Sequence, residues 1–201
     1  MQIHWPCTDN TGPTIDPPLT EVWQGLERAY DEGKAKAIGV SNYSTVKLQE
    51  TLSSARIAPH VNQVEVHVGF RNDRQFDFCS RHNIHVSAYS PLGSQVRVSK
   101  HPMEMDEVKT VAKRHNATVG QIMLAYVLAK GASVIPKTTK AERIEENLGA
   151  LKIKLSSEDL KQLDGVRQVR MIPGRSWLKP ETGPFRTLED LWDGELDCDE
   201  C

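Results

Sequence analysis

The chain has 201 residues, a formal net charge of -2 and 38% hydrophobic residues, which suits one domain with a sizeable core. This charge balance argues against a nucleic-acid-binding surface, and the lack of any run of 18 apolar residues argues against a membrane-spanning helix. Residues 1–6 lack the basic start and apolar stretch of a signal peptide, and four scattered cysteines fit a reducing compartment. We therefore expect a cytoplasmic protein.

Short apolar or β-branched runs alternate with helical patterns along the chain. If residues 1–6 are the end of a strand, further strands are expected at 34–41, 61–66, 84–90 and 132–136. Helical spacing of apolar residues is found at 20–32, 44–54, 73–82, 103–115, 118–129, 140–148 and 156–165. Such alternation predicts parallel strands, in a doubly wound sheet or a barrel. From about residue 167 onward, Pro and Gly residues predict loop.

Hydroxyl side chains stand at three of the predicted helix starts and are candidate N-caps: Thr20, Ser44 and Ser156. The helix predicted at 118–129 starts at Thr118. Ser156 is followed three residues later by Asp159, which is close to a capping box. Gly33 is a candidate helix stop, and Gly131 follows the helix predicted at 118–129. In the helix at 44–54, the expected apolar stripe consists of Val46, Leu48 and Leu52.

The last nine residues hold five acids and a C-x-x-C pair, Cys198 and Cys201. One interpretation is a redox pair or half of a zinc site. The other is a solvated acidic tail with two free thiols, which we favour because no second ligand pair exists. The seven histidines show no metal-ligand spacing, and we expect no metal site. His4 alone stands at a predicted strand end, where it is either a functional group or a satisfied strand-end histidine.

Polar side chains follow the predicted strand ends, where active sites of α/β barrels form. They belong to the segments His4–Pro6, Ser41–Asn42, Asn62–Glu65, Tyr89–Ser94 and Pro136–Thr139. Tyr89 is either a core aromatic or a platform for a flat cofactor ring. There is no G-x-G-x-x-G, so a Rossmann fingerprint is absent.

Cations and hydroxyls gather before and within the helix predicted at 140–148. Lys137, Thr138 and Arg143 could bind a phosphate at the helix N-terminus, or belong to a capped surface helix. Glu146 and Asn147 could bond the edge of an adenine that stacks on Arg143, or lie on a solvated helical face.

At this point the motifs resemble the aldo-keto reductases. The matching segments are IHWP at 3–6, GKAKAIGVSNYS at 33–44, VNQVEVH at 61–67, AYSPLGS at 88–94 and VIPKTT…RIEEN at 134–147. The resemblance implies an α/β fold, a (β/α)8 barrel that reduces aldehydes or ketones with NADPH. The tail at 183–193 also resembles the family's C-terminal extension, while Val68 stands where the family usually has Pro.

The resemblance also implies roles on the nicotinamide side of the site. Ser41, Asn42 and Gln63 would hold the carboxamide, and Tyr89 would stack on the nicotinamide ring. His4 would orient the substrate carbonyl as the matched catalytic residue. Trp5 would form a wall of the substrate pocket.

Further positions would bind the rest of the cofactor, NADP(H). Ser90, Leu92 and Ser94 would line the pyrophosphate. The 2′-phosphate and adenosine would contact Lys137, Thr138 and Arg143, and Arg143 with Glu146 and Asn147 would surround the adenine. A Lys and an Arg together favour NADPH over NADH, because the 2′-phosphate rewards nearby cations.

Three of the family's four catalytic residues, a Tyr, a Lys and an Asp, have no match in this chain. They lie on the first three βα units of the family barrel, and Met1 stands where the fourth strand is nearly over. We therefore expect a partial (β/α)8 barrel with strands 4–8 over residues 1–166 and an irregular, acidic C-terminal extension over 167–201. The full-length form would be the reductase. This chain alone would have little or no activity, and its open sheet edges would favour self-association in place of the family's usual monomer.

The alternative is a non-catalytic protein, a pseudoenzyme or splice fragment, that binds a nucleotide or a partner chain. For the reductase, the expected small-molecule substrate is an aldehyde or ketone. In either case we expect no nucleic acid and no membrane as partner.

Overall fold

The computed structural model describes residues 1–7, 12–94 and 100–199. It forms two compact units, each built from separate stretches of chain. The first unit comprises Met1–Val64, Asp73–Val86 and Pro173–Leu196. The second comprises Glu65–Asn72, Ser87–Ile172 and, of the described C-terminal residues, Asp197–Asp199. Within the described ranges, no helix has the length and apolar character that crossing a membrane requires.

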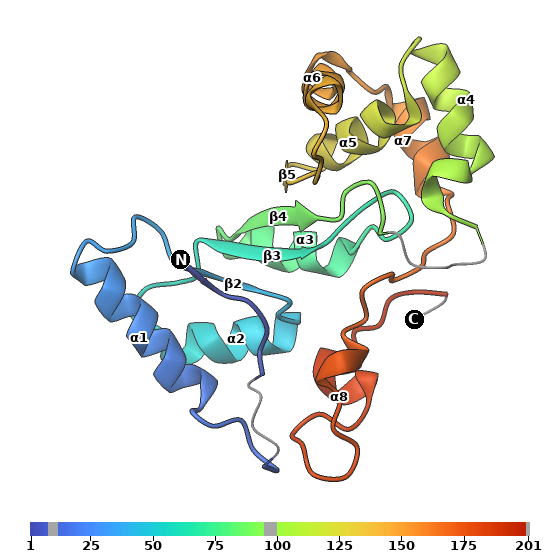
Figure 1. Ribbon diagram of the computed structural model, residues 1–201. Helices are drawn as coiled ribbons and strands as arrows, with labels where there is room; N and C mark the ends of the chain where they lie inside the picture. The colour runs from blue at the N-terminus through green and yellow to red at the C-terminus, as the bar shows by residue number, and fades with distance from the viewer. Residues whose placement is uncertain (8–11, 95–99, 200–201) are drawn as a thin grey trace. The chain divides into compact units, whose positions relative to one another are not determined.

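Five parallel strands confirm the predicted α/β class (Figure 1). In the first unit, β1 (Gln2–Ile3) pairs with β2 (Gly39–Ser41), which pairs with β3 (Val61–Glu65). Strand β4 (His85–Tyr89) pairs with β5 (Ser133–Val134) through Ser87 and Ala88, which belong to the second unit. The hydrogen-bonded order follows the chain, β1-β2-β3-β4-β5. All five strands lie where the sequence predicts them, and all are shorter than predicted.

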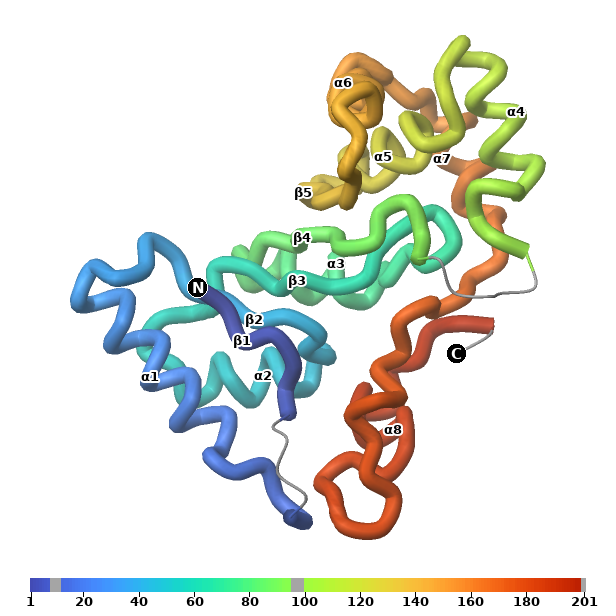
Figure 2. The backbone as a smooth tube through the Cα atoms, viewed as in Figure 1, coloured from blue at the N-terminus to red at the C-terminus, as the bar shows by residue number. Residues whose placement is uncertain are grey.

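The register at the start of the sheet fixes which strand ends meet. Ile3 lies opposite Val40, and Ser41 lies opposite Gln63. Figure 2 shows β1 running beside β2 in this arrangement. Gly39 is required in β2 because a Cβ there would lie 2.5 Å from the Val61 carbonyl oxygen. Residues 34–38, which the sequence assigns to the same strand, precede β2 and are not part of it.

The helices α1 (Leu19–Asp31), α2 (Thr45–Ser54) and α3 (Asp73–Arg81) belong to the first unit. Trp23 of α1 is buried and its indole N–H donates to the Ile57 carbonyl at 3.1 Å. The prediction that Thr20 caps α1 is wrong: the helix begins at Leu19, and Pro18 occupies the N-cap in an extended conformation. Because Pro18 already fixes the backbone entering the helix, Thr20 falls inside the first turn.

Lys47 of α2 is buried where the sequence predicts an apolar stripe. Val46 is 43% exposed, so its predicted place in that stripe is wrong, whereas Lys47 is 5% exposed. The Lys47 ammonium donates to the Leu191 carbonyl oxygen at 2.9 Å and pairs with the Asp193 carboxylate. It also lies 5.1 Å from the centre of the Phe185 ring. The N-cap prediction at Ser44 is confirmed, since its hydroxyl accepts from the Lys47 N–H.

The partners of Lys47 lie in the C-terminal segment of the first unit, residues 173–196. This segment contains a 3-10 turn at Arg175–Trp177 and the short helix α8 (Leu188–Trp192), capped by Thr187, so the predicted loop is interrupted by helix. The segment is also fastened to α2 by Glu195, whose carboxylate accepts from the Thr45 N–H at 2.9 Å. Cys198 is disulfide-bonded, so the predicted free thiol is wrong at this position, and Cys201 lies outside the described residues.

The helices of the second unit are α4 (Asp106–Arg114), α5 (Val119–Ala129), α6 (Ala141–Gly149) and α7 (Ser157–Asp164). The predicted helix at 103–115 is divided, because Met105 is extended between a 3-10 turn at Pro102–Glu104 and α4. Helix α5 is buried along seven of its 11 residues. A helix that is apolar on nearly all sides must be surrounded. In Figure 1 it lies among the other helices of this unit.

Two capping boxes begin helices of the second unit. The one at Ser156 confirms the sequence prediction, whereas the one at Thr118 was not predicted. The Thr118 hydroxyl accepts from the Gln121 N–H at 3.1 Å, and the Gln121 side chain accepts from the Thr118 N–H at 3.1 Å. Ser156 and Asp159 form the same reciprocal pair at α7. An Asp at the third helical position therefore replaces the Glu or Gln that the motif usually has.

We expect Thr118→Ala to lower the free energy of unfolding by about 1 kcal/mol, the usual cost of losing an N-cap. Thr118 also donates to Glu146 of α6 at 2.6 Å, so the loss should include this link. Urea denaturation followed by circular dichroism would measure it. Thr110→Ala, at an exposed position on α4, is the control. Equal stability of the two variants would contradict the role of the cap.

Asp159 joins α7 to α4. It is 1% exposed, and its carboxylate accepts from the Arg114 guanidinium and from His115 Nε2 at 2.9 Å. Burial alone would raise the pKa of Asp159, but hydrogen bonds from His115, Ser156 and Arg114 outweigh burial and hold the pKa well below its usual range. The carboxylate is therefore ionised in the folded protein at neutral pH.

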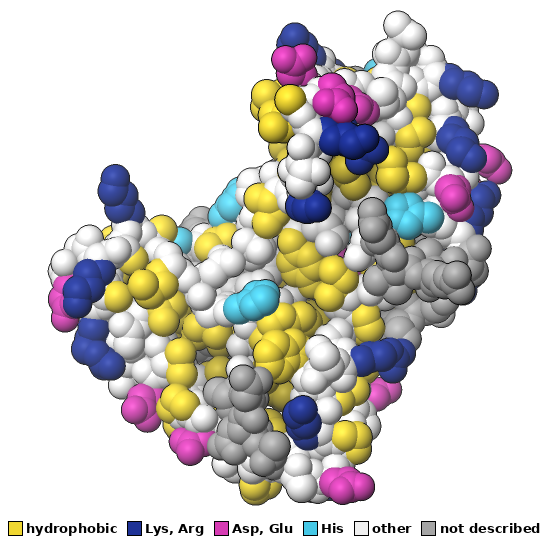
Figure 3. All heavy atoms as spheres, viewed as in Figure 1, with side chains coloured by type: hydrophobic (Ala, Val, Ile, Leu, Met, Phe, Trp, Pro, Cys, Tyr) yellow, Lys and Arg dark blue, Asp and Glu magenta, His cyan; other side chains and the backbone are white. Residues whose placement is uncertain are grey.

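Helix α6 carries apolar side chains that face solvent. Ile144 is 53% exposed and Leu148 is 58% exposed, one helical turn apart, and Leu151 follows in the 3-10 turn at Ala150–Lys152. Figure 3 shows apolar side chains over this helix. The self-association expected from the sequence stays a prediction.

Candidate active site

The strand register of the first unit brings four predicted site residues together. Ser41 ends β2 beside Gln63 of β3, and its hydroxyl donates to the Gln63 carbonyl oxygen at 2.7 Å. The Asn42 side-chain amide donates to the His4 carbonyl oxygen at 3.0 Å and to the Ser41 hydroxyl at 3.2 Å. Four predicted residues, from the ends of β1 and β2 and from the middle of β3, thus form one hydrogen-bonded group.

Asn42 also turns the chain out of β2. Its φ is +61°, in the left-handed region, which Asn tolerates better than other residues with a Cβ. The turn is buried, and the Asn42 N–H donates to the Gln63 carbonyl oxygen at 3.0 Å. Asn42 therefore fixes both the backbone exit from β2 and the position of the His4 main chain.

Gln63 presents a side-chain amide at this strand end. The residue is partly exposed, and its amide makes no hydrogen bond with any other residue of the described ranges. A primary amide offers two donors and an acceptor. These three positions are therefore available to a ligand that carries a complementary amide.

His4 and Trp5 lie side by side but differ in exposure. His4 is exposed, whereas Trp5 is 8% exposed. Trp177 and Trp192 pack against the Trp5 ring, with centroids 6.0 Å and 5.9 Å away. A Cβ on Gly174 would come within 2.8 Å of the Trp5 ring, so the close approach requires glycine there. The sequence does not predict that Trp177 and Trp192 cover Trp5, because both lie in a segment without clear strand or helix periodicity.

Tyr89, at the end of β4, belongs to the second unit. The residue is partly exposed, yet burial, followed by the nearby Glu65 carboxylate, raises the pKa of its hydroxyl far above the usual range. Arg170 and a backbone hydrogen bond from Glu65 act in the opposite direction without cancelling the rise. The hydroxyl end is therefore desolvated and stays neutral, which leaves the ring as the part that can meet a ligand.

Residues 90–94 form a tight turn directly after Tyr89. Ser90 and Gly93 have φ values of +49° and +79°, and the Gly93 N–H donates to the Ser90 carbonyl oxygen at 2.8 Å. Backbone amides in such conformations can form a concave anion site. Leu92 and Ser94 are partly exposed at this turn, as is Ser90.

The cationic residues predicted to bind phosphate surround the start of α6. Lys137 and Arg143 are exposed, and the Thr138 hydroxyl accepts from the Lys140 N–H at 3.1 Å. Lys140 occupies the N-cap and supplies no side-chain acceptor to the helix. Glu146 and Asn147 lie one turn further on and are partly exposed.

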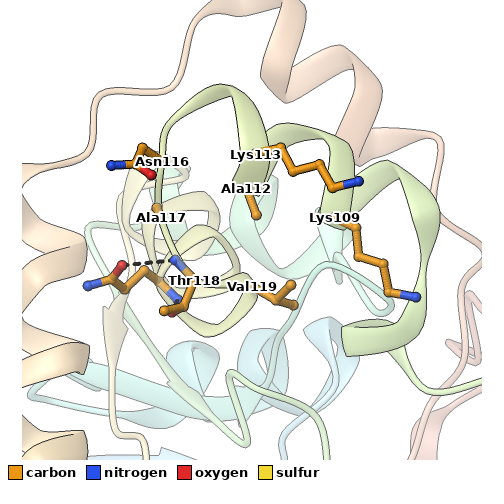
Figure 4. Close-up of a pocket in the computed structure, with 8 residues that line it drawn as sticks. Lys109, Ala112, Lys113, Asn116, Ala117, Thr118 and Val119 are labelled. Carbon is orange, nitrogen blue, oxygen red and sulfur yellow. Dashed lines mark hydrogen bonds between the residues drawn. The ribbon is translucent and has the colours of Figure 1, made fainter.

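A pocket of about 660 Å³ lies elsewhere in the second unit. It is lined by residues of α4 and of the start of α5, including Lys109, Lys113, Asn116 and Thr118 (Figure 4). None of the predicted site residues lines it. In Figure 4 the dashed line marks the Thr118–Gln121 bond of the capping box, and the two lysine side chains extend outward from α4.

The family model described as Aldo/keto reductase family matches residues 1–168. An aldo-keto reductase from Arabidopsis thaliana, family 4 member C11, is 36% identical over 205 residues, which is 96% of this chain and 64% of that protein. The (1S)-1,7-diacetoxy-luvungin A aldo-keto reductase of Citrus sinensis is 38% identical over 177 residues, 87% of this chain and 55% of that protein.

Among solved structures, the Bombyx mori aldo-keto reductase in complex with NADP is similar, with a TM-score of 0.73 and 28% identity over 81% of this chain and 55% of that chain. The chain thus spans 55–64% of the length of these relatives. Because the family model covers most of its residues, the chain belongs to the aldo/keto reductase family.

Proposed function

We propose that this chain binds NADP(H) and, as part of a protein of its relatives' length, takes part in reducing an aldehyde or ketone to an alcohol. The observation that carries this proposal is the group at the strand ends of the first unit. There Gln63 lies opposite Ser41 in the strand register, its carbonyl oxygen accepts from Ser41 and Asn42, and its side-chain amide has no partner among the described residues. A nicotinamide carboxamide is the complementary ligand, since it offers both an N–H donor and a carbonyl acceptor.

Each remaining part of the cofactor has a proposed contact. Tyr89 stacks on the nicotinamide ring. Its partly exposed ring and desolvated hydroxyl support this role, because stacking uses the face and not the edge. The backbone turn at Ser90, Leu92 and Ser94 binds the pyrophosphate. Its left-handed conformations support this, because they turn N–H groups toward one side.

The 2′-phosphate and adenosine bind at the start of α6. Lys137 and Arg143 supply the positive charge, and Thr138 adds a hydroxyl. The uncapped first turn of α6 adds main-chain N–H groups and the positive end of the helix dipole. Glu146 and Asn147 contact the adenine edge, and Arg143 stacks on its face.

For the chemistry, the reduced nicotinamide supplies a hydride when bound. His4, exposed beside Trp5, hydrogen-bonds the substrate carbonyl, and Trp5 walls its pocket. No Tyr, Lys or Asp of this chain matches the family's other catalytic positions, so we propose that these 201 residues bind cofactor but reduce carbonyls slowly or not at all alone. We assign residues 1–166 to strands 4–8 of the family barrel and place the protein in the cytoplasm.

Titration with NADPH, followed by tryptophan fluorescence or calorimetry, tests the proposed function directly. Arg143→Met should weaken NADPH binding about tenfold, the order expected for one charge-assisted hydrogen bond. NADH binding should weaken less, since NADH has the adenine on which Arg143 stacks but no 2′-phosphate. Arg81→Met, at an exposed position on α3, is the control for the loss of a positive charge. An equal loss of NADH affinity would contradict the assignment of Arg143 to the 2′-phosphate, and no NADPH binding at all would contradict the function.

A further inference from the structure

Met171 holds the turn at residues 90–94 through its sulfur atom. The Ser94 N–H donates to Met171 Sδ at 3.1 Å, and the Ser94 carbonyl oxygen accepts from His101 Nε2 at 3.1 Å. The same two side chains close over Gly93, where a Cβ would lie 2.9 Å from His101 Nε2 and 3.3 Å from Met171 Sδ. The turn is therefore held by His101, seven residues after Ser94, and by Met171, 77 residues after it.

Met171 is itself fixed by Glu65. One Glu65 carboxylate oxygen accepts from the Met171 N–H at 2.8 Å and from His67 Nε2 at 3.1 Å, and the other accepts from the Ile172 N–H at 2.9 Å. Glu65 is 3% exposed and Met171 is also 3% exposed. Because a buried carboxylate with three donors is hard to move, the Met171 backbone stays in place while its long, flexible side chain can change rotamer.

The hydrogen bond between the Ser94 N–H and the Met171 sulfur is weaker than the hydrogen bond that a phosphate oxygen would accept from the same N–H. A thioether is a weak acceptor, whereas a phosphate oxygen is charged and forms a shorter, stronger bond with an N–H. If the Ser94 N–H stays in place and only its acceptor changes, it has a hydrogen-bond partner both with and without the ligand. Without the sulfur, the Ser94 amide would lose this partner in the free protein, at a free-energy cost.

We propose that Met171 is a positioning residue. In the free protein its thioether sulfur accepts the hydrogen bond from the Ser94 N–H, and when the cofactor binds, a diphosphate oxygen becomes the acceptor instead. This inference rests on the proposed function, because it places the diphosphate of NADP(H) at residues 90–94. Cofactor binding is then an exchange: the Ser94 N–H moves its hydrogen bond from sulfur to phosphate oxygen, and the Met171 side chain withdraws while Glu65 keeps its backbone in place.

Met171→Leu removes the acceptor and keeps the volume. It should tighten binding of NADPH about three- to tenfold, because the ligand no longer competes with the sulfur and one net hydrogen bond is worth that ratio. Binding of 2′-phospho-ADP-ribose, which has the diphosphate but no nicotinamide, should tighten equally. Binding of 2′-AMP, which has no diphosphate, should stay unchanged. Met123→Leu, in the fully buried part of α5, is the matched control and should change none of the three.

A measurement on the unchanged protein guards against a variant that does not fold. The Ser94 amide proton should move downfield in the NMR spectrum when 2′-phospho-ADP-ribose is added, as expected when sulfur is replaced by a charged oxygen. Unchanged or weaker NADPH binding in Met171→Leu, or an unmoved Ser94 resonance in the ligand-saturated wild type, would overturn the exchange while leaving the proposed function intact. No binding of any of the three ligands to the wild-type chain would overturn both.

Discussion

Asp159→Asn should lower the free energy of unfolding by about 3 kcal/mol at pH 7, the order expected for breaking a buried, charge-assisted cluster. The carboxylate accepts hydrogen bonds from the backbone and hydroxyl of Ser156, from Arg114 and from His115. An amide has one oxygen and would direct an NH2 group at donors. The change therefore removes the bond to α4 and part of the α7 cap together. Urea denaturation would measure the loss.

The stabilisation by Asp159 should depend on pH in one direction. Its pKa is lowered in the folded protein, so the unfolded carboxyl, with a pKa near 3.9, binds protons more readily. The stabilisation is therefore fully present above about pH 4 and declines as the pH falls toward the folded pKa. The difference in unfolding free energy between wild type and Asp159→Asn should shrink below pH 4.

Glu158→Gln is the control for this pair of results, since Glu158 occupies the same first turn of α7 and is exposed. It should cost only a few tenths of a kcal/mol through the helix dipole. A cost for Asp159→Asn that stays constant from pH 7 to pH 3 would show that the ionised carboxylate is not the stabilising group.

Lys47→Met should weaken the attachment of the C-terminal segment of the first unit to α2, while the bond between Thr45 and Glu195 remains. Methionine keeps the apolar stem but leaves the Leu191 carbonyl and the Asp193 carboxylate without their ammonium donor. Since Asp193 is partly exposed, water replaces part of what is lost, and we expect a cost of about 2 kcal/mol. Trypsin cleavage at exposed Arg175 and Arg186 should accelerate correspondingly.

Fluorescence gives a second measurement on the same variant. Trp5, Trp177 and Trp192 form one cluster with this segment, so emission should shift to longer wavelength at lower urea concentration. Lys36→Met, at an exposed position before β2, is the control. If Lys47→Met and Lys36→Met were cleaved at the same rate, the ammonium would not be what fastens the segment.

Much of the fold follows from local patterns. The alternation of apolar runs locates all five strands and the helices α1 to α7, because buried parallel strands and amphipathic helices each have their own period. The sequence predicts longer strands than the structure has. For example, β1 and β2 pair through only two residues each. The burial of Lys47 depends on Asp193, 146 residues later, and no local pattern records such a partner.

For the candidate site, motif order places Ser41, Asn42 and Gln63 at neighbouring strand ends, and the register brings them together. What the sequence does not contain is how their hydrogen bonds are used. That the Asn42 amide bonds the His4 carbonyl follows only from three-dimensional neighbours. The same holds for Glu65, whose carboxylate binds amides 106 and 107 residues away.

The discontinuous make-up of the first unit has a consequence for protein synthesis. The strands β1 to β3 leave the ribosome early, but Trp5 and Lys47 receive their partners only when residues 173–196 have been made. The second unit needs no residue from that stretch and can pack its helices first. Until residues 173–196 are synthesised, the Trp5 indole therefore stays uncovered and the Lys47 ammonium lacks its partners from that segment. We expect chaperones to retain nascent chains that stall before residue 173.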